Sequence, residues 1–108
     1  MDKDPMQNIA GIDRTIHSPA RLMILSCLVV VSAADFTFLL NQTGLTRGNL
    51  SISLGKLEEA GYVNIKKEFV NKMPRTLIRL TAKGRKAIQG YRERMQWVID
   101  GLDSDALK

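Results

Sequence analysis

Apolar residues recur at helical spacing over most of the chain and alternate with polar residues only between positions 62 and 80. The most apolar run, LMILSCLVVV at residues 22–31, follows Ser18-Pro19, a capping residue and a proline suited to the first helical position. We therefore predict a central core helix from about Pro19 to Val31. A weaker helical or turn-like segment precedes it over residues 9–16, and residues 1–8 are predicted to be a flexible N-terminus.

Two further helices are predicted on either side of Gly44. Asp35 can cap the first, over residues 36–43, and Gly44 allows the sharp turn that ends it. Thr46 can cap the second helix, which Gly61 ends. Two short helices joined through a glycine turn form a helix-turn-helix motif.

The second helix of this pair has one apolar stripe, which consists of Leu50, Leu54 and Leu57. Ile52 lies about 160° from that stripe at about 100° per residue, so it should be exposed. The other positions predicted on the outer surface are small, polar or basic: Arg47, Gly48, Asn49, Ser51, Ser53, Gly55 and Lys56. A helix with such short outer side chains can approach another surface closely.

A two-stranded hairpin is predicted to follow this helix. Residues 62–69 alternate in hydrophobicity, with Phe69 among the inward positions, and residues 71–74 read as a turn. The second strand runs to Leu80 and turns either Leu77 or Ile78 inward, depending on its register. The tip of the hairpin is basic.

A long helix that Thr81 can cap closes the pattern, and its apolar residues recur at the spacing of a helix that packs along a partner helix. This stripe consists of Ile88, Tyr91, Met95, Val98 and Leu102. Trp97 falls on a second face, which a partner subunit explains better than the chain's own core. We predict a homodimer that uses these residues together with Ile9, Ile12 and Ile16, followed by a flexible tail over residues 103–108.

The charge of the 108-residue chain is concentrated in its second half. The net charge is +5, and nine basic residues accompany a single acidic one, Glu68, between Tyr62 and Arg92. Residues 1–43, in contrast, carry three basic and four acidic side chains. This asymmetry suggests a surface for a polyanion and predicts double-stranded DNA as the partner. The length and the 44% apolar content indicate one compact domain over residues 9–102.

The rest of the composition narrows the class of protein. The single Cys27 cannot form an intrachain disulfide and lies in an apolar run, which favours a reducing compartment, the cytoplasm. That run is too short for a bilayer, which takes about 20 residues, so no membrane partner is predicted. The lone His17 and Cys27 do not build a convincing metal site, and no nucleophile with a base can be assembled. We expect no metal, no cofactor and no enzymatic activity.

Three pieces of the sequence resemble the small winged-helix transcriptional regulators related to the MarR and ArsR groups. They are IHSPARLMIL, ADFTFLLNQTGLTRGNLSISLGKLEEAGYV and KKEFVNKMPRTLIRLTAKGRKAI, and the resemblance covers roughly residues 9–102. It implies a mainly α, α+β fold, a winged helix-turn-helix with a two-stranded β wing and a long C-terminal dimerisation helix. It also implies homodimers that place one recognition helix per subunit in successive major grooves.

The resemblance further implies which residues contact DNA. Relatives often carry long basic or polar residues where this chain has Ile52 and Ser53, and the methyls of Ile52 suit a thymine methyl group. On the wing, one of Lys66 and Lys67 is the better candidate for protecting an exposed strand edge. The implied contacts are Arg47, Asn49, Ser51, Ile52, Ser53 and Lys56 on the recognition helix and Lys72 and Arg75 on the wing.

Relatives of this kind often bind small molecules in a crevice between the dimerisation helices and the DNA-binding lobe. Residues that could line such an effector site, with ordinary core packing as the alternative, are Phe36, Phe38, Tyr91, Met95 and Trp97. Metal-sensing relatives use paired cysteines near the recognition helix, and this chain has one cysteine in all.

The sequence thus predicts a cytoplasmic, sequence-specific DNA-binding transcriptional regulator that acts as a homodimer on a palindromic operator. Its symmetry should set the half-sites about one helical turn apart, ~10 bp. One alternative is a winged-helix protein-protein interaction module, which a steep salt dependence of DNA binding would exclude. Another is a non-sequence-specific chromatin or RNA-binding protein, which would bind poly(dI-dC) as tightly as its own promoter.

Overall fold

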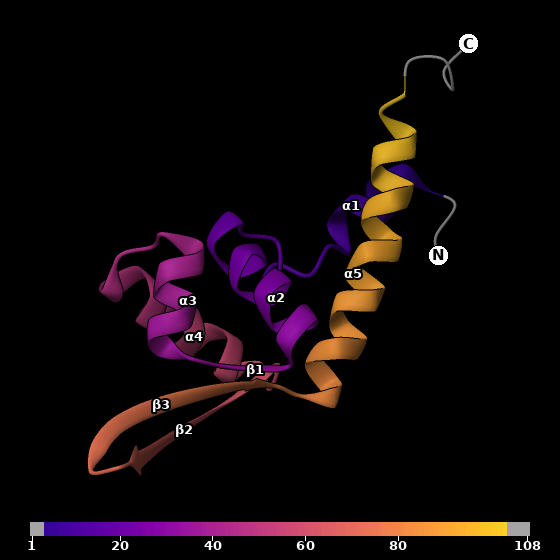
Figure 1. Ribbon diagram of the computed structural model, residues 1–108. Helices are drawn as coiled ribbons and strands as arrows, with labels where there is room; N and C mark the ends of the chain where they lie inside the picture. Colours follow the sequence, from indigo (N-terminus) through magenta and orange to yellow (C-terminus); the bar gives the residue numbers. More distant parts are fainter. Residues whose placement is uncertain (1–3, 104–108) are drawn as a thin grey trace.

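The computed structural model describes residues 4–103 as a helical body with a small antiparallel sheet along one edge (Figure 1). In chain order the elements are α1 (Pro5–Ala10), α2 (Pro19–Val31), β1 (Ala33–Asp35), α3 (Phe36–Thr43), α4 (Arg47–Glu59), β2 (Val63–Val70), β3 (Met73–Leu80) and α5 (Ala82–Gly101). Helices α3 and α4 form the helix-turn-helix, and β2 and β3 form the wing. The predicted winged helix fold is therefore confirmed.

Helix α2 lies at the centre of the core. Its buried residues Ile24, Leu25 and Leu28 belong to one cluster with the leucine stripe of α4, and α3 and α4 both pack against α2. Val63 and Ile78 close the cluster from the sheet side. Cys27 is half-buried against the same cluster.

The helix boundaries follow the caps that the sequence carries. The side-chain oxygens of Ser18, Asp35, Thr46 and Thr81 each accept a hydrogen bond from an amide in the first turn of the helix that follows. Gly44 ends α3 in the left-handed conformation, with φ of 70°. Helix α4 ends at Glu59, slightly before the predicted stop at residue 61.

The N-terminal segment is more ordered than the sequence predicts. The prediction of a flexible segment over residues 1–8 is wrong for Pro5–Asn8, because these residues belong to α1. Helix α1 packs against α5, where Arg94 donates to the carbonyl oxygen of Asn8 at 3.3 Å, a favourable place for a cation near a helix C-terminus. This contact joins distant parts of the chain, so local patterns could not predict it. Residues 1–3, and 104–108 of the predicted tail, lie outside the described residues.

The wing belongs to a three-stranded sheet in the order β1-β3-β2. The sequence pattern does not predict β1, because three residues are too few to show alternation. In the observed register Ile78 pairs with Ile65, and of the two alternatives Leu77 and Ile78 it is Ile78 that faces the core. The hairpin extends beyond the helical body (Figure 1), so the prediction that Phe69 faces inward is wrong, and this side chain is 77% exposed.

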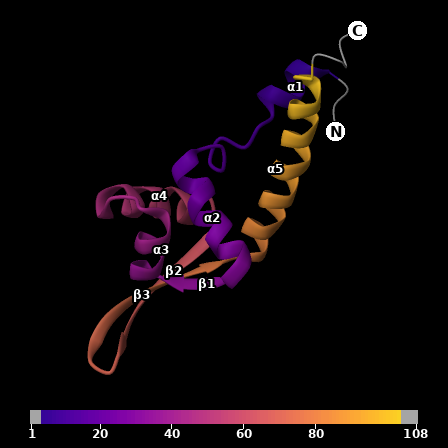
Figure 2. The same ribbon diagram turned by 45° about the horizontal axis from the view of Figure 1, so that its top comes forward.

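Helix α5 starts at the sheet and runs along one side of the molecule (Figure 2). Its start is locked in place, because Gly84 is buried and a Cβ there would stand 2.2 Å from the carbonyl oxygen of Tyr62. The Thr81 hydroxyl also donates to the carbonyl oxygen of Gly61 at 2.7 Å. Its far end lies beside α1, away from the wing (Figure 1). Among the described helices, none combines the length and apolar character needed to cross a membrane.

Candidate nucleic-acid interface

The recognition helix α4 is fixed to the core by Leu50, Ser53, Leu54 and Leu57, its four buried residues. The predicted outward position of Ser53 is therefore wrong. Ser53 follows Leu50 by three positions and precedes Leu57 by four, which puts it on the leucine face, and it is 5% exposed. A stripe read from apolar residues alone misses a small polar residue within it.

The outermost line of α4 runs opposite this buried face through Gly48, Ile52, Gly55 and Glu59. At about 100° per residue, these positions lie within about 30° of the direction opposite the leucine face. Ile52 is exposed as predicted. A Cβ at Gly48 or Gly55 would meet nothing within 4 Å, so packing within the subunit requires glycine at neither position.

The predicted base and phosphate contacts divide between the two flanks of this line. Arg47 and Ser51 lie on one flank and Asn49 and Lys56 on the other, each about 90° from the outermost line. All four side chains are exposed. All four predicted contacts are therefore accessible on α4, but they lie on its two flanks and not along its outermost line.

On the flank of Ser51, a groove of about 320 Å³ separates α4 from the hairpin. It is lined by Phe36, Ser51, Leu54, Ile65, Lys67 and Thr76. Lys67 pairs with Thr76 on the same face of the hairpin as Ile65, so its side chain lines this groove from the wing side. Lys66 lies on the opposite face, 4.0 Å from Glu68, and remains the candidate edge charge.

The tip of the wing is a two-residue turn in which Asn71 and Lys72 both have positive φ, 52° and 66°. Two positive φ angles match a type I′ turn, whose second position favours glycine. A non-glycine residue in this conformation costs roughly 1–2 kcal/mol, and here it places an exposed ammonium group at the end of the wing. The Nε of Arg75 lies 3.9 Å from the carboxylate of Asp35, which offsets part of its charge.

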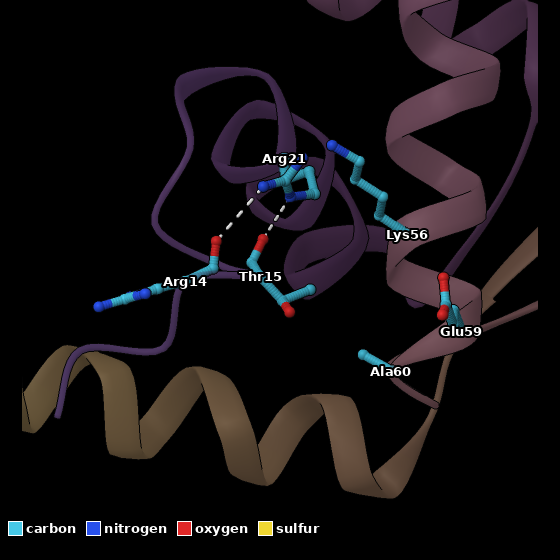
Figure 3. A pocket seen from close by; sticks show the side chains of 6 residues that line it. All are labelled: Arg14, Thr15, Arg21, Lys56, Glu59 and Ala60. Atoms are coloured by element: carbon cyan, nitrogen blue, oxygen red, sulfur yellow. Dashed lines mark hydrogen bonds between the residues drawn. The ribbon is translucent and has the colours of Figure 1, made fainter.

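On the opposite flank of α4, a cleft of about 450 Å³ opens toward α2 and the loop before it (Figure 3). It is lined by Arg14, Thr15, Arg21, Lys56, Glu59 and Ala60. In Figure 3 the Lys56 side chain extends from α4 toward the guanidinium of Arg21. Sequence reasoning missed Arg14 and Arg21, since only tertiary packing brings them beside α4.

Asp13 fixes the loop that carries Arg14. One carboxylate oxygen accepts hydrogen bonds from the amides of Thr15 and Ile16 at 2.9 and 3.2 Å. The other accepts one from the Tyr62 hydroxyl at 2.5 Å, which, with burial and the charge of Asp13, raises the pKa of Tyr62 to about 12. Because Tyr62 directly precedes β2, this bond ties the loop to the start of the wing.

The predicted dimerisation residues differ in how far their own subunit buries them. Ile16 is fully buried in the subunit's own core, so its prediction as a dimer contact is wrong. Ile88 and Tyr91 are half-buried against that core, and Ile12, Met95 and Val98 are also half-buried. The apolar residues that remain exposed on α1 and the far end of α5 are Met6, Ile9, Trp97, Ile99 and Leu102.

Two of the five residues proposed for an effector crevice line different cavities. Tyr91 lines an apolar cleft of about 290 Å³ between α2 and α5, whereas Phe36 lines the groove beside the wing. Phe38 and Trp97 are exposed. The His17 Nδ1 lies 2.9 Å from the Tyr91 hydroxyl, and burial raises the pKa of Tyr91. Within residues 4–103, no three metal-ligating side chains gather.

A helix-turn-helix that exposes its second helix, followed by a basic hairpin, defines the class of winged helix DNA-binding proteins. The comparison with known families agrees with this geometry. The chain belongs to the winged helix DNA-binding domain family, which matches residues 20–99.

Known relatives support this assignment. An uncharacterised protein of Methanocaldococcus jannaschii is 37% identical over 78 residues, which are 72% of this chain and 85% of that protein. A transcriptional regulator homologue from Pyrococcus horikoshii OT3 superposes with a TM-score of 0.82 at 29% identity, over 92% of this chain and 97% of that one. The structure of NadR in complex with 4-hydroxyphenylacetate has a TM-score of 0.66 at 26% identity, over 95% and 72% of the two chains. A MarR family regulator from Silicibacter pomeroyi shares the fold.

Proposed function

We propose that this protein is a cytoplasmic, sequence-specific transcriptional regulator that binds a palindromic operator as a homodimer. The observation that carries the proposal is the outermost line of α4, which holds two glycines that the fold does not require. A helix of about 10–12 Å diameter fits a major groove about 12 Å wide. Glycines at its outer surface let the backbone approach the base edges closely.

Each exposed side chain of the interface suits a particular part of DNA. Arg47 and Asn49 lie in the first turn of α4, the part of a recognition helix that contacts bases, and suit guanine and adenine. Ile52 suits a thymine methyl group. Lys67 and Lys72 on the wing suit phosphates, and Arg75 joins them when a phosphate replaces Asp35 as its partner.

The test compares DNA from upstream of the protein's own gene with random DNA of equal length. We expect R47A and N49A to reduce the preference for the upstream DNA, whereas K72A weakens binding to both DNAs alike and reduces the salt slope by about 1. Equal losses for all variants on both DNAs would contradict the division into base and phosphate contacts. Binding that is insensitive to salt would favour the protein-interaction alternative.

The homodimer is proposed from the exposed apolar residues on α1 and α5. Trp97 is 51% exposed and Leu102 is 75% exposed, at the end of α5 that lies farthest from the wing (Figure 1). Exposed apolar patches mark sites of association, and tryptophan is common among the residues that dominate interfaces. A symmetric pair joined at these helices would present two recognition helices, which suits half-sites about 10 bp apart.

We also propose that the apolar cleft between α2 and α5 receives a small effector. It is lined mainly by aliphatic side chains, with Ser26 and Tyr91 as its polar residues, and His17 contacts the Tyr91 hydroxyl. A volume of about 290 Å³ lies at the lower end of the range for ligand sites. The neighbour NadR was solved with 4-hydroxyphenylacetate, so thermal-shift screening should begin with small aromatic acids. If Val29→Trp abolishes the thermal shift caused by one of these acids, that acid binds in this cleft.

A further inference from the structure

We propose that the basic cleft beside α4, where Lys56 extends toward Arg21 and Arg14 extends away on the other side (Figure 3), binds the phosphate backbone of DNA on the side of the recognition helix away from the wing. This inference rests on the proposed DNA-binding function. It adds a second backbone anchor from a loop and a helix that lie outside the helix-turn-helix and the wing.

The geometry of the major groove offers a place for such an anchor on each flank of the recognition helix. A helix lying in the groove has one sugar-phosphate backbone on each flank, because the groove is about as wide as the helix. Lys67 lines the groove on the flank of Ser51 from the wing side. The opposite flank carries Lys56, and the cleft there collects Arg14 and Arg21. The cleft therefore lies where the second backbone would run.

The basic side chains of the cleft form no ion pair among the described residues. None of Arg14, Arg21 and Lys56 has a carboxylate within ion-pair distance in the described part of the chain, where the ion pairs are Lys66–Glu68 and Arg75–Asp35. The Arg21 guanidinium donates to the backbone carbonyl oxygens of Thr15 and Arg14, the latter at 3.3 Å. Those bonds hold the group in place, use two of its five N–H donors and leave its charge free.

Glu59 is the one carboxylate that lines the cleft. Its removal should change DNA affinity in the direction opposite to the removal of a basic residue. A phosphate bound beside Arg21 and Lys56 would be repelled by Glu59. Removal of that negative charge should therefore tighten DNA binding, while removal of Lys56 should weaken it. Because Glu59 and Lys56 also belong to the recognition helix, their opposite effects support the anchor only together with a loss of affinity on removal of Arg14, which lies outside α4.

The experiment measures the affinity of the full chain for fluorescein-labelled upstream DNA from about 50 to 200 mM salt. We expect R14Q and K56Q each to weaken binding several-fold and to reduce the salt slope by about 0.9, and E59Q to tighten binding by a similar factor. Arg92→Gln is the matched control, since it removes the same charge from an exposed position on α5. Circular dichroism checks that every variant is folded.

The outcomes separate this inference from the proposed function. If wild-type protein and R92Q bind with a steep salt slope and R14Q and K56Q bind equally well, the cleft is not an anchor while the function stands. If the wild type shows no salt-dependent binding, the function itself fails. Inorganic phosphate that stabilises the wild type but not K56Q, with DNA affinity the same in both, would assign the cleft to a free anion and overturn the backbone anchor.

Discussion

The recognition helix α4 and the C-terminal helix α5 are supported in different ways. Helix α4 has thirteen residues and buries four of them in the subunit's core, whereas α5 has twenty and buries only Gly84 at its start. The core therefore fixes the orientation of α4 within one subunit. Helix α5 is fixed at its start and by α1 near its end, and its exposed apolar residues have no cover in the subunit. Folding of one subunit therefore accounts for the position of α4, whereas the exposed apolar residues of α5 are explained by the proposed homodimer.

The largest effect is expected where α5 starts. In G84A, the new methyl group would overlap the carbonyl oxygen of Tyr62, so the helix start or the strand must move. We expect a loss of about 3 kcal/mol in the free energy of unfolding, measured by urea denaturation. The control is G90A, where a Cβ meets nothing within 4 Å and helix propensity should add about 1 kcal/mol. Equal changes in the two variants would show that the start of α5 is not locked.

The next prediction tests whether the C-terminal end of α5 forms the proposed dimer interface. Trp97→Glu places a charge at the exposed apolar end of the helix, so we expect a monomer by sedimentation. Operator affinity should fall about 100-fold as the two recognition helices become independent. Unfolding of the helix-turn-helix lobe should be unaffected. The matched control Gln89→Glu adds the same charge at an exposed position on α5. A W97E dimer, or a monomer with full operator affinity, would refute the assembly.

A smaller effect tests the close approach of α4 to DNA. In G55A, a good helix former replaces glycine at an open position, so the free energy of unfolding should rise by about 1 kcal/mol. The same methyl group faces the proposed groove floor, and we expect about a tenfold loss of operator affinity, about 1.4 kcal/mol. Gly90→Ala supplies the comparison, because it should stabilise the chain without weakening DNA binding. If G55A binds as tightly as wild type, the glycine does not serve close approach.

Local signals explain what the sequence predicts correctly. Ser18, Asp35 and Thr46 cap helices because a capping bond involves residues only two or three positions apart. The exposure of Ile52 follows from helix geometry alone. These features depend only on residues within one or two helical turns of each other, so the local sequence is enough to predict them.

The features that the sequence does not predict depend on contacts between distant parts of the chain. Ile16 has helical spacing with Ile9, but only the packed core shows that the two face different surroundings, one buried and the other 45% exposed. Strand β1 exists because β3 pairs with it, and the basic cleft exists because Arg21 and Lys56 meet across two helices. The periodicity of apolar residues does not show which distant segments come into contact.

The smallest expected effect concerns the wing, where stability and binding are predicted to oppose each other at one residue. Lys72→Gly relieves the left-handed strain at the turn, so the free energy of unfolding should rise by about 1 kcal/mol. It also removes the proposed phosphate contact of Lys72, so operator affinity should fall a few-fold and the salt slope by about 0.9. Asn71→Gly is the matched control, because it relaxes the neighbouring turn position without changing charge and should leave affinity intact. If K72G and N71G affect binding equally, the strained lysine is a feature of the turn and the wing tip does not contact DNA.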